Sequence, residues 1–417
     1  MSGWTEVRLG DGLRVHHGFA FKGEFFSPVG KQIVLTPGNF VERGGFKPKN
    51  GTEKYYLGEA PQKFVLSRGD VVIAMTEQSQ GLLGSSATIP EDETYLHNQR
   101  IGLVEVTDPR LLDLRFVSHL VNSAHVRKQI QATATGSKVR HTAPDRIESV
   151  TAFVPSVAEQ QAVANILDTF DELIENNRRR VQVLEKMGRT IYREWFVKFR
   201  YPGHKSIPLV NSPLGPIPEG WGVSSLSNIA SITMGQSPRS EFYNDEGIGK
   251  PFHQGVSDFG LHFPKTRKWC SADGRSAGEG DILISVRAPV GRVNLADTDI
   301  TIGRGLSAVR AKDGRQGLLL GHIREAFAKE DSMGNDGAIF KSLGKAELSA
   351  VPIVVAPAEV ADHADRILSD NLALIRTLFG AAEELVAMRD LLLPKLVTGQ
   401  IDVSSLDLDR VLEGAVA

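Results

Sequence analysis

The feature that most constrains this chain is an internal repeat, because its second half repeats the pattern of its first. Residues 69–74 read GDVVIA and residues 280–285 read GDILIS, and both fit a turn followed by a buried strand. Farther on, Gly136 aligns with Gly337, an offset of 337 − 136 = 201 residues. A chain of 417 residues also exceeds what one hydrophobic core usually organises. We therefore expect two similar domains.

The register of 201 holds through the end of each half, whereas the starts align at a different offset. Pairs at the offset of 201 are Ile147 and Leu348, Val150 and Val351, Ile166 and Ile367, Leu184 and Leu385, Met187 and Met388, and Ile191 and Leu392. Pairs at an offset of 217, near the starts, are Trp4 and Trp221, and Leu9 and Leu226. The halves therefore differ by insertions ahead of a better-matched end.

Each half closes with a long stretch in which apolar residues recur in alternating steps of three and four, the seam of a coiled coil. The first seam comprises Ile166, Phe170, Leu173, Asn177, Val181, Leu184, Gly188, Ile191 and Trp195. The second comprises Val360, Ala364, Ile367, Asn371, Leu374, Leu378, Ala381, Leu385, Met388 and Leu392. One asparagine in each seam is expected to set its register. At about 1.5 Å per residue, helices of about 40 residues are about 60 Å long.

Prolines and glycines delimit these helices and divide the chain into five segments. Pro155 and Pro357 stand just before the helices, where proline is tolerated, and Gly399 ends the second helix. Residues 201–221 are rich in Pro, Gly and Ser and are expected to form an extended linker. The expected segments are residues 1–155 for a first globular domain, 156–200 for a central helix, 201–356 for the linker and a second globular domain, 357–400 for a distal helix and 401–417 for a tail.

The predicted fold is of the α/β class, with two globular domains separated by two long antiparallel coiled-coil helices and related by an internal pseudo-twofold repeat. The helices are expected to be antiparallel because the linker returns the chain to its starting side. Two domains held at a fixed separation suit a DNA target with two specific parts and an unread spacer, since protein geometry sets the spacing of half-sites.

The composition is that of an ordinary globular protein, with 41% hydrophobic and 24% charged residues. No apolar stretch approaches the roughly 20 residues of a membrane span, and the start lacks a secretion signal, so we expect a cytoplasmic protein. The single cysteine, Cys270, excludes an internal disulfide. The formal net charge of −2 argues against a strongly basic protein that binds DNA alone. DNA binding therefore requires local basic clusters or charge from partner subunits.

The main alternative is a stand-alone DNA-modifying enzyme, whose usual signatures the sequence lacks. Without a Pro-Pro dipeptide, the aromatic tetrapeptide by which amino-methyltransferases hold a flipped base is excluded. No lysine stands two places after Asp or Glu, as in common metal nucleases. Residues 303–308 match G-x-G-x-x-A but read as a turn before a strand, and neither a P-loop nor an H-x-x-x-H spacing occurs. We expect no catalytic residue and no metal. A coiled-coil scaffold, the second alternative, has no reason to carry paired globular domains.

Side chains that read base edges are present in both halves, since arginine pairs with guanine, and Asn and Gln with adenine. The candidates in the second half are Arg287, Arg292 and Asn294, followed by Gln236, Ser237, Arg239, His253 and Gln254. Those in the first half are Gln78, Gln80, Arg100, Lys138 and Arg140. Lys138, Arg140 and Lys341 precede the final strand of each half and are candidates for phosphate contacts. The alternative for each is an ordinary solvated side chain.

Several short segments, taken together, point to a known family. They are residues 158–168 (AEQQAVANILD) with 175–177 (ENN), 217–221 (IPEGW), 234–238 (MGQSP), 281–294 (DILISVRAPVGRVN) and 389–396 (RDLLLPKL). With them, nearly the whole chain resembles the specificity (S) subunits of type I restriction-modification systems. Two segments depart from the family pattern. Residues 358–363 lack the glutamine pair of residues 160–161, and the loop at residues 75–84 lacks the Arg-Ala-Pro sequence.

The resemblance implies that each globular half is a target recognition domain and that the chain is not catalytic. The helices would space the two domains and dock two modification (methyltransferase) subunits, and two restriction subunits can join for DNA cleavage. S-adenosylmethionine, ATP and Mg are then expected in the partners and not in this chain. Candidate partner-binding residues, at the helix ends, are Tyr192, Trp195, Phe196, Phe199, Leu391, Leu392 and Leu393. Aromatic clusters are enriched at interfaces, and core packing against the neighbouring domain is the equal alternative.

Overall fold

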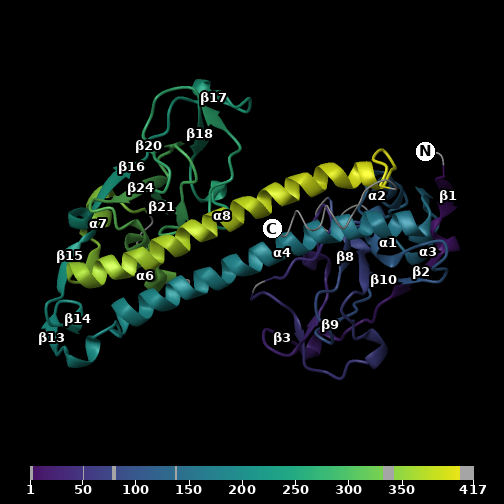
Figure 1. Cartoon of the computed structure of the whole chain (residues 1–417), viewed down its shortest axis with the longest axis horizontal. Coiled ribbons are helices and arrows are strands. Elements are labelled where there is room, and N and C mark those ends of the chain that lie inside the picture. Colours follow the sequence, from purple (N-terminus) through teal and green to yellow (C-terminus); the bar gives the residue numbers. More distant parts are fainter. Residues whose placement is uncertain (1–2, 50, 78–80, 137–138, 332–341, 404–417) are drawn as a thin grey trace. The chain divides into compact units, whose positions relative to one another are not determined.

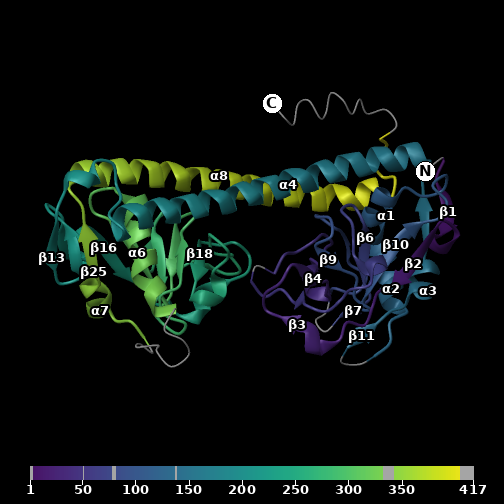
Figure 2. The same cartoon turned by 90° about the horizontal axis from the view of Figure 1, so that it is seen from below.

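The computed structural model describes residues 3–49, 51–77, 81–136, 139–331 and 342–403, which form two compact units. The first unit combines Met1–Asn176 with Ala381–Ala417, and the second is Asn177–Gly380. Each unit holds a strand-rich part and segments of two long helices, which lie along one side of the strands (Figures 1 and 2). The last helical segment of the chain thus belongs to the same unit as its start.

The core of the first unit is a four-stranded antiparallel sheet covered by two short helices. In spatial order, its strands are β2 (Leu13–His17), β10 (Ile101–Val106), β6 (Val71–Ala74) and β8 (Ser86–Thr88). The helices are α1 (Leu114–Val121) and α2 (Ala124–Ala132). Asp113 and Ser123 precede them and accept backbone N–H groups of the first turn, which explains where each helix begins. Phe116, Val121 and Ile130 from the helices join the apolar core of this sheet.

Smaller elements complete the first unit. A second sheet has the order β3 (Phe26–Ser27), β5 (Tyr55–Tyr56), β4 (Gln32–Val34) and β9 (Tyr95–Leu96), with β4 and β9 parallel. Two further pairs are β1 (Thr5–Arg8) with β12 (Thr151–Val154), and β7 (Thr76–Glu77) with β11 (Arg140–His141). The helix α3 (Pro144–Glu148) leads into β12 and begins with proline, which is tolerated there.

The second unit repeats this topology. Its central sheet has the order β16 (Ala230–Met234), β24 (Leu306–Ala311), β21 (Ile282–Ser285) and β22 (Val293–Leu295). Its second sheet has the order β17 (Tyr243–Asn244), β19 (Trp269–Cys270), β18 (Lys250–His253), β23 (Ile300–Ile302) and β20 (Ser276–Ala277), with β18 and β23 parallel. The remaining elements are β15 (Gly222–Ser225) paired with β25 (Pro352–Val355), α5 (Leu226–Ile229), α6 (Gln316–Asp331) and α7 (Lys345–Ala350).

A recurring hydrogen bond confirms both repeat offsets at once. The N–H of Leu9 donates to the carbonyl of Val150 at 2.9 Å, and the N–H of Leu226 donates to that of Val351 at 2.9 Å. The donors are 217 residues apart and the acceptors 201 (226 − 9 and 351 − 150). The predicted α/β fold with an internal repeat is therefore correct.

The two long helices are α4 (Val157–Tyr192), which continues as a π-helical turn over Arg193–Val197, and α8 (Ala358–Leu396). In the first unit, residues near the start of α4 pack against the end of α8, as in the 2.6 Å ion pair of Asp171 with Arg389. In the second unit, Val181 packs against Ile375 and Leu378 of α8. Inside each unit the two helices therefore run antiparallel, as predicted.

The buried face of α8 differs from the predicted seam. Leu374 and Met388, two seam positions, are 41% and 51% exposed, whereas Leu368, Ile375 and Ala382 are buried. The difference arises because α8 packs against the strand-rich part as well as against α4: Leu372 and Phe379 contact the core of the central sheet. The buried face of a helix that packs on two sides is not the same as the single seam that a coiled coil would bury.

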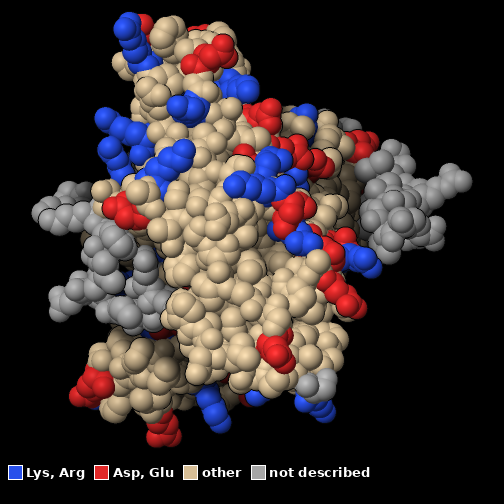
Figure 3. Space-filling view, turned by 90° about the vertical axis from the view of Figure 1, so that its left-hand side faces the viewer, with Lys and Arg blue, Asp and Glu red and all other residues tan. Residues whose placement is uncertain are grey.

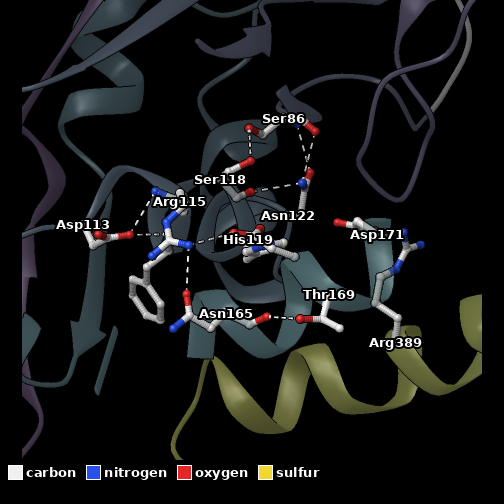
Figure 4. Close-up of polar contacts among 12 residues, drawn as sticks. Ser86, Asp113, Arg115, Ser118, His119, Asn122, Asn165, Thr169, Asp171 and Arg389 are labelled. Carbon is white, nitrogen blue, oxygen red and sulfur yellow. Dashed lines mark hydrogen bonds and ion pairs between the residues drawn. The ribbon is translucent and has the colours of Figure 1, made fainter. Parts of the chain in front are cut away.

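Polar side chains attach α4 to the central sheet of the first unit (Figure 4). The ring of His119, on α1, lies 2.8 Å from the carboxylate of Asp168 on α4, and nearby Arg115 donates to Asn165 at 2.8 Å. From the same helix, Ser118 bonds to the Ser86 hydroxyl of β8 at 3.3 Å. Through these side chains, α1 connects the long helix α4 to strand β8.

Residues 201–221, expected to be an extended linker, instead contain a hairpin of β13 (Leu209–Ser212) and β14 (Gly215–Pro218). Gly215, with a φ of +97°, permits the tight turn between the strands. The hairpin exposes Ile207, Leu209, Val210 and Leu214. Figure 3, in which this end of the second unit faces the viewer, shows a broad surface with few charged side chains. Among the residues described, no helix is long and apolar enough to cross a membrane.

Candidate nucleic-acid interface

The first element of the candidate interface is the loop of residues 286–292, which follows β21 in the second unit. The Ser285 hydroxyl fixes this loop, because it donates to the carbonyl of Pro289 (2.7 Å) and accepts from the N–H of Arg292 (2.9 Å). Gly291 has a φ of +82°, and a Cβ there would lie 2.7 Å from the ring of Phe327. These contacts hold the loop in one conformation.

Both arginines predicted in this loop are exposed. The backbone of Arg287, just after β21, pairs with Ser342, and Arg292 stands at the other end of the loop. A rigid loop that presents guanidinium groups matches the direct readout of guanine, which needs donors in a fixed orientation.

The second predicted group lies where β16 ends. The carboxamide of Gln254 donates to the Ser237 hydroxyl at 2.9 Å, and that hydroxyl also accepts from the N–H of Arg304 at 3.2 Å. Gly235 approaches the carbonyl of Gly303 so closely that a Cβ would lie 2.2 Å from its oxygen. This crossing brings segments near residues 236, 254 and 304 together, and Gln236 and Arg239 are exposed beside it.

Two other candidates of the second half are interior residues. Asn294 is 3% exposed and donates from its carboxamide to the carbonyl of Gly260 at 3.1 Å. His253 is buried, and burial lowers the pKa of its imidazole, since the charged form is disfavoured away from water. In this structure neither side chain is accessible to a base edge, and we leave both out of the proposed reading set.

In the first unit, the equivalent loop follows β6 and is braced by a buried carboxylate. Glu77 accepts from the N–H groups of Gly81 (3.0 Å) and Leu83 (2.9 Å) and from the Arg140 guanidinium (3.0 Å). Arg127, also buried, donates to the carbonyls of Gly81 and Leu83. Burial lowers the pKa of Arg127, and the carboxylate of Glu77 opposes that effect.

Arg140 therefore has protein partners within the unit, since its guanidinium also donates to the carbonyl of Gln131 at 2.7 Å. These bonds support the loop, and the phosphate contact predicted for Arg140 stays a prediction. Arg100 is exposed in the segment before β10. Four other predicted contacts, Gln78, Gln80, Lys138 and Lys341, lie outside the described residues.

The sequence analysis missed Arg304, an exposed residue between Gly303 and Gly305. Its sequence signal is the glycine on either side, which indicates a turn. In the structure, Gly305 lies close to the backbone of Gln254, and Arg304 stands on that turn. Among the described parts of the chain, no group of three or more His, Cys, Asp and Glu could hold a metal ion.

The predicted partner-binding aromatics belong to a core. Tyr192 and Phe196 are buried in a cluster with Trp221, and Trp195 and Phe199 pack against it. The Tyr192 hydroxyl lies 2.9 Å from Nδ1 of buried His322. Of the leucines at the end of α8, Leu392 and Leu393 pack against the first core and Leu391 is exposed. The core-packing alternative thus describes the aromatic cluster in this structure.

Comparison with known proteins connects these features to a family. Residues 1–186 match the family described as the type I restriction modification DNA specificity domain. The putative type I restriction enzyme MjaX specificity subunit of Methanocaldococcus jannaschii is 33% identical over 256 residues, which cover 60% of this chain and 59% of that protein. The EcoBI specificity subunit of Escherichia coli is 21% identical over 330 residues, covering 74% of this chain and 65% of that protein. The matches span less than two thirds of the length of these curated relatives.

The fold has a solved counterpart of nearly the same extent. A crystal structure of the type I restriction-modification system S subunit from M. genitalium aligns with 94% of this chain and 96% of its own, with a TM-score of 0.65 and 16% identity. At this identity the likeness shows the fold alone. Residues 1–186 are thus similar to the type I restriction modification DNA specificity domain, and the fold of the chain is similar to that of a type I restriction-modification S subunit.

Proposed function

We propose that this chain is the DNA sequence-recognition subunit of a type I restriction-modification complex and reads a DNA site with two separate parts. One observation carries the proposal: two domains of the same topology each present a braced loop at the same place, after β6 and after β21, while the loop sequences differ. Domains that share a frame but differ in their loops suit two unlike half-sites.

In the second domain, the reading set is proposed to comprise Arg287, Arg292, Gln236, Ser237, Gln254 and Arg304. Arg239 borders this set, but its guanidinium lies 3.8 Å from the Glu241 carboxylate, so we do not count it among the reading residues. Their guanidinium and carboxamide groups provide the donors and acceptors that distinguish base pairs in the major groove. In the first domain, Arg100 is proposed to have the equivalent role. Phosphate contacts are assigned to basic residues around these loops, and the remaining charge to partner subunits, since the chain has a net charge of −2.

The chain is proposed to have no catalytic step of its own. S-adenosylmethionine, ATP and Mg would be bound by modification and restriction subunits, and the relatives are named specificity subunits. The isolated chain should therefore neither methylate nor cut DNA, whereas the chain mixed with its modification subunits should methylate. Transfer of a labelled methyl group by the homogeneous chain alone would contradict the assignment.

Docking of two modification subunits is supported by apolar side chains on the outer face of the long helices. Met187 and Met388, which are 201 residues apart, are 49% and 51% exposed. Val183 and Leu391 are exposed as well. Exposed methionines suit adaptable interfaces, and their repetition suits a partner that binds twice.

The reading role is tested by mapping methylated bases in cells that express the complex with Arg287→Ala and Arg292→Ala. Each substitution should cost about 1–3 kcal/mol at a directly read base pair. The second half-site should relax while the first keeps its sequence. Arg110→Ala, which removes an exposed arginine of the first unit, is the control and should change neither half-site. An unchanged pattern in the double variant would remove both arginines from the reading set.

A further inference from the structure

The two domains share a surface turn in which an aromatic side chain is exposed. In the first domain, Lys22 precedes a 3-10 turn over Gly23–Phe25. In the second, Arg239 precedes a 3-10 turn over Ser240–Phe242. The turns are 217 residues apart (239 − 22), and Phe25 and Phe242, at equivalent positions, are 40% and 38% exposed.

Hydrogen bonds show that the surroundings of the turns are equivalent too. The carbonyl of Phe25 accepts the N–H of Leu57, just after β5, at 3.0 Å, and the carbonyl of Phe242 accepts the N–H of Ser271, just after β19, at 3.1 Å. Just before β5, the carbonyl of Lys54 accepts from the N–H of Val34 at 2.8 Å. The carbonyl of Lys268 accepts from the N–H of Phe252 at the same distance. Each domain therefore places a phenylalanine at the same surface position, three residues after a basic residue.

Further apolar side chains extend each turn into a patch. The first patch comprises Phe25, Phe26, Val29 and Leu57, all exposed, and the second comprises Phe242 and Ile248 with half-buried Tyr243. In Figure 1, β3 and β17, which these turns enter, each lie at an edge of their own unit away from the long helices. Groups of exposed apolar side chains on neighbouring segments of this kind suit interaction sites.

Ring contacts hold the two exposed phenylalanines of the first patch and the tyrosine of the second. Tyr56 meets the rings of Phe25 and Phe26 edge to face, with centroids 5.8 and 5.9 Å away, and Tyr243 stacks on Phe252 at 4.5 Å. Such packing limits how far the rings of Phe25, Phe26 and Tyr243 can withdraw from water by changing rotamer. A binding partner can cover them without that rearrangement.

The charges beside the patches favour a protein over a DNA duplex. Each turn carries a carboxylate, Glu24 in the first and Glu241 in the second, and a guanidinium nitrogen of Arg239 lies 3.8 Å from the Glu241 carboxylate. Phosphates would meet both signs of charge, whereas a protein rim can complement them. Because the patch occurs once per domain in domains with otherwise unlike loops, its occupant should be present in two identical copies.

We propose that the two patches are equivalent docking sites, each for one copy of the modification subunit. The proposal rests on the proposed function and adds a contact on the recognition domains to that on the long helices. It also explains why unlike domains keep the same exposed aromatic: the partner they share is the same protein.

The test measures stoichiometry in the absence of DNA. The full-length chain is mixed with excess modification subunit and analysed by native mass spectrometry and by titration. Phe25→Glu should weaken binding of one copy at least tenfold and leave the second copy in place, so that a complex with one modification subunit accumulates. Phe242→Glu should do the same, and the double variant should weaken both. Phe25→Ser, which adds no charge, should act in the same direction.

Phe153→Glu is the matched control, because Phe153, on β12, is an exposed phenylalanine (51%) outside both patches. Two copies bound by every variant with unchanged affinity would overturn the proposal. Normal assembly with loss of DNA affinity would overturn it too, in favour of a duplex at these patches. If the unaltered chain binds no modification subunit at all, the proposed function fails instead. The copy that remains bound to each single variant shows that the chain has folded.

Discussion

Glu77 and Arg140 form a 3.0 Å ion pair in the first domain, within the loop region that follows β6 and includes Gly81 and Leu83. The Glu77 side chain is 3% exposed and also accepts the N–H groups of Gly81 and Leu83. A buried carboxylate without such donors would be costly. The pair therefore holds the loop by interactions that depend on both partners.

Replacing Glu77 with alanine should destabilise the first unit by about 2–3 kcal/mol, because two backbone N–H groups and a guanidinium lose their acceptor. Urea unfolding measures this loss. In the assembled complex, reading of the first half-site should also relax while the second half-site is unchanged.

Glu105→Ala is the control for this substitution. Glu105 pairs with His16 at 2.6 Å on the surface, and its loss should change the free energy of unfolding by no more than about 0.5 kcal/mol. If Glu77→Ala is as mild as Glu105→Ala, the buried acceptor does not support the loop.

A second prediction concerns Gln160, whose buried carboxamide anchors the start of α4. It accepts from the N–H of Asp113 at 2.9 Å and donates to the carbonyls of Leu111 and Pro155 at 2.9 Å. Gln160→Ala removes all three bonds inside the protein and should cost about 2–4 kcal/mol in urea unfolding.

The repeat supplies the control for Gln160. The equivalent position in α8 is Ala361, and there the next residue, Asp362, forms a 2.7 Å ion pair with Arg315. Because that pair is more exposed, Asp362→Ala should cost less than about 1 kcal/mol. Equal losses at the two sites would mean that the carboxamide network is not the stronger anchor. The departure of residues 358–363 from the glutamine pattern thus reflects a different anchor.

The repeat and the long helices could be predicted from sequence. The repeat appears as matching residues at constant offsets, and each helix as a regular spacing of apolar residues. The apolar period locates α8, but it cannot reveal that Leu372 and Phe379 pack against the central sheet, which turns the buried face of the helix. Similarly, the aromatics of residues 192–199 could be interface or core. Trp221, which follows the β13–β14 hairpin, packs in the same cluster and shows that these aromatics belong to a core.

The candidate interface was less predictable, since its geometry depends on contacts between distant residues. Arg140 looked like a surface cation, but its acceptor Glu77 lies 63 residues earlier. Asn294 stood in a loop-like sequence, yet it belongs to β22 and bonds to Gly260, 34 residues away. The exposure of Arg287 and Arg292 was predictable, because proline and glycine in the same segment indicate an exposed loop, while their reading role stays a prediction.

A third prediction follows from the left-handed glycine of that loop. Gly291→Ala forces a Cβ to within 2.7 Å of the buried Phe327 ring and also strains the backbone at a φ of +82°. Gly280 has the same φ of +82° with nothing near its missing Cβ, so Gly280→Ala isolates the backbone strain of about 1–2 kcal/mol. Gly291→Ala should lose more than Gly280→Ala in urea unfolding and should relax reading at the second half-site. Equal losses would show that Phe327 yields to the new methyl group.

The last prediction is a pH dependence carried by His322 on α6. Burial lowers the pKa of this imidazole to about 4, an effect that Asp313 opposes, and Nδ1 lies 2.9 Å from the Tyr192 hydroxyl. In the unfolded chain the pKa is about 6.5. As the pH falls below that value, the unfolded state takes up the proton first and becomes favoured.

The contribution of His322 to the stability of the second unit should therefore be complete above about pH 6.5 and fall progressively toward pH 4, by about 3 kcal/mol in all. Burial also lowers the pKa of His253 in the same unit, so the stability of this unit falls more steeply toward acid pH than His322 alone would give. His322→Gln keeps a polar partner for Tyr192 and does not titrate. Urea unfolding of both proteins between pH 4 and pH 8 should give a difference that changes with pH and levels off above pH 7. A difference independent of pH would show that His322 is protonated alike in the folded and unfolded states.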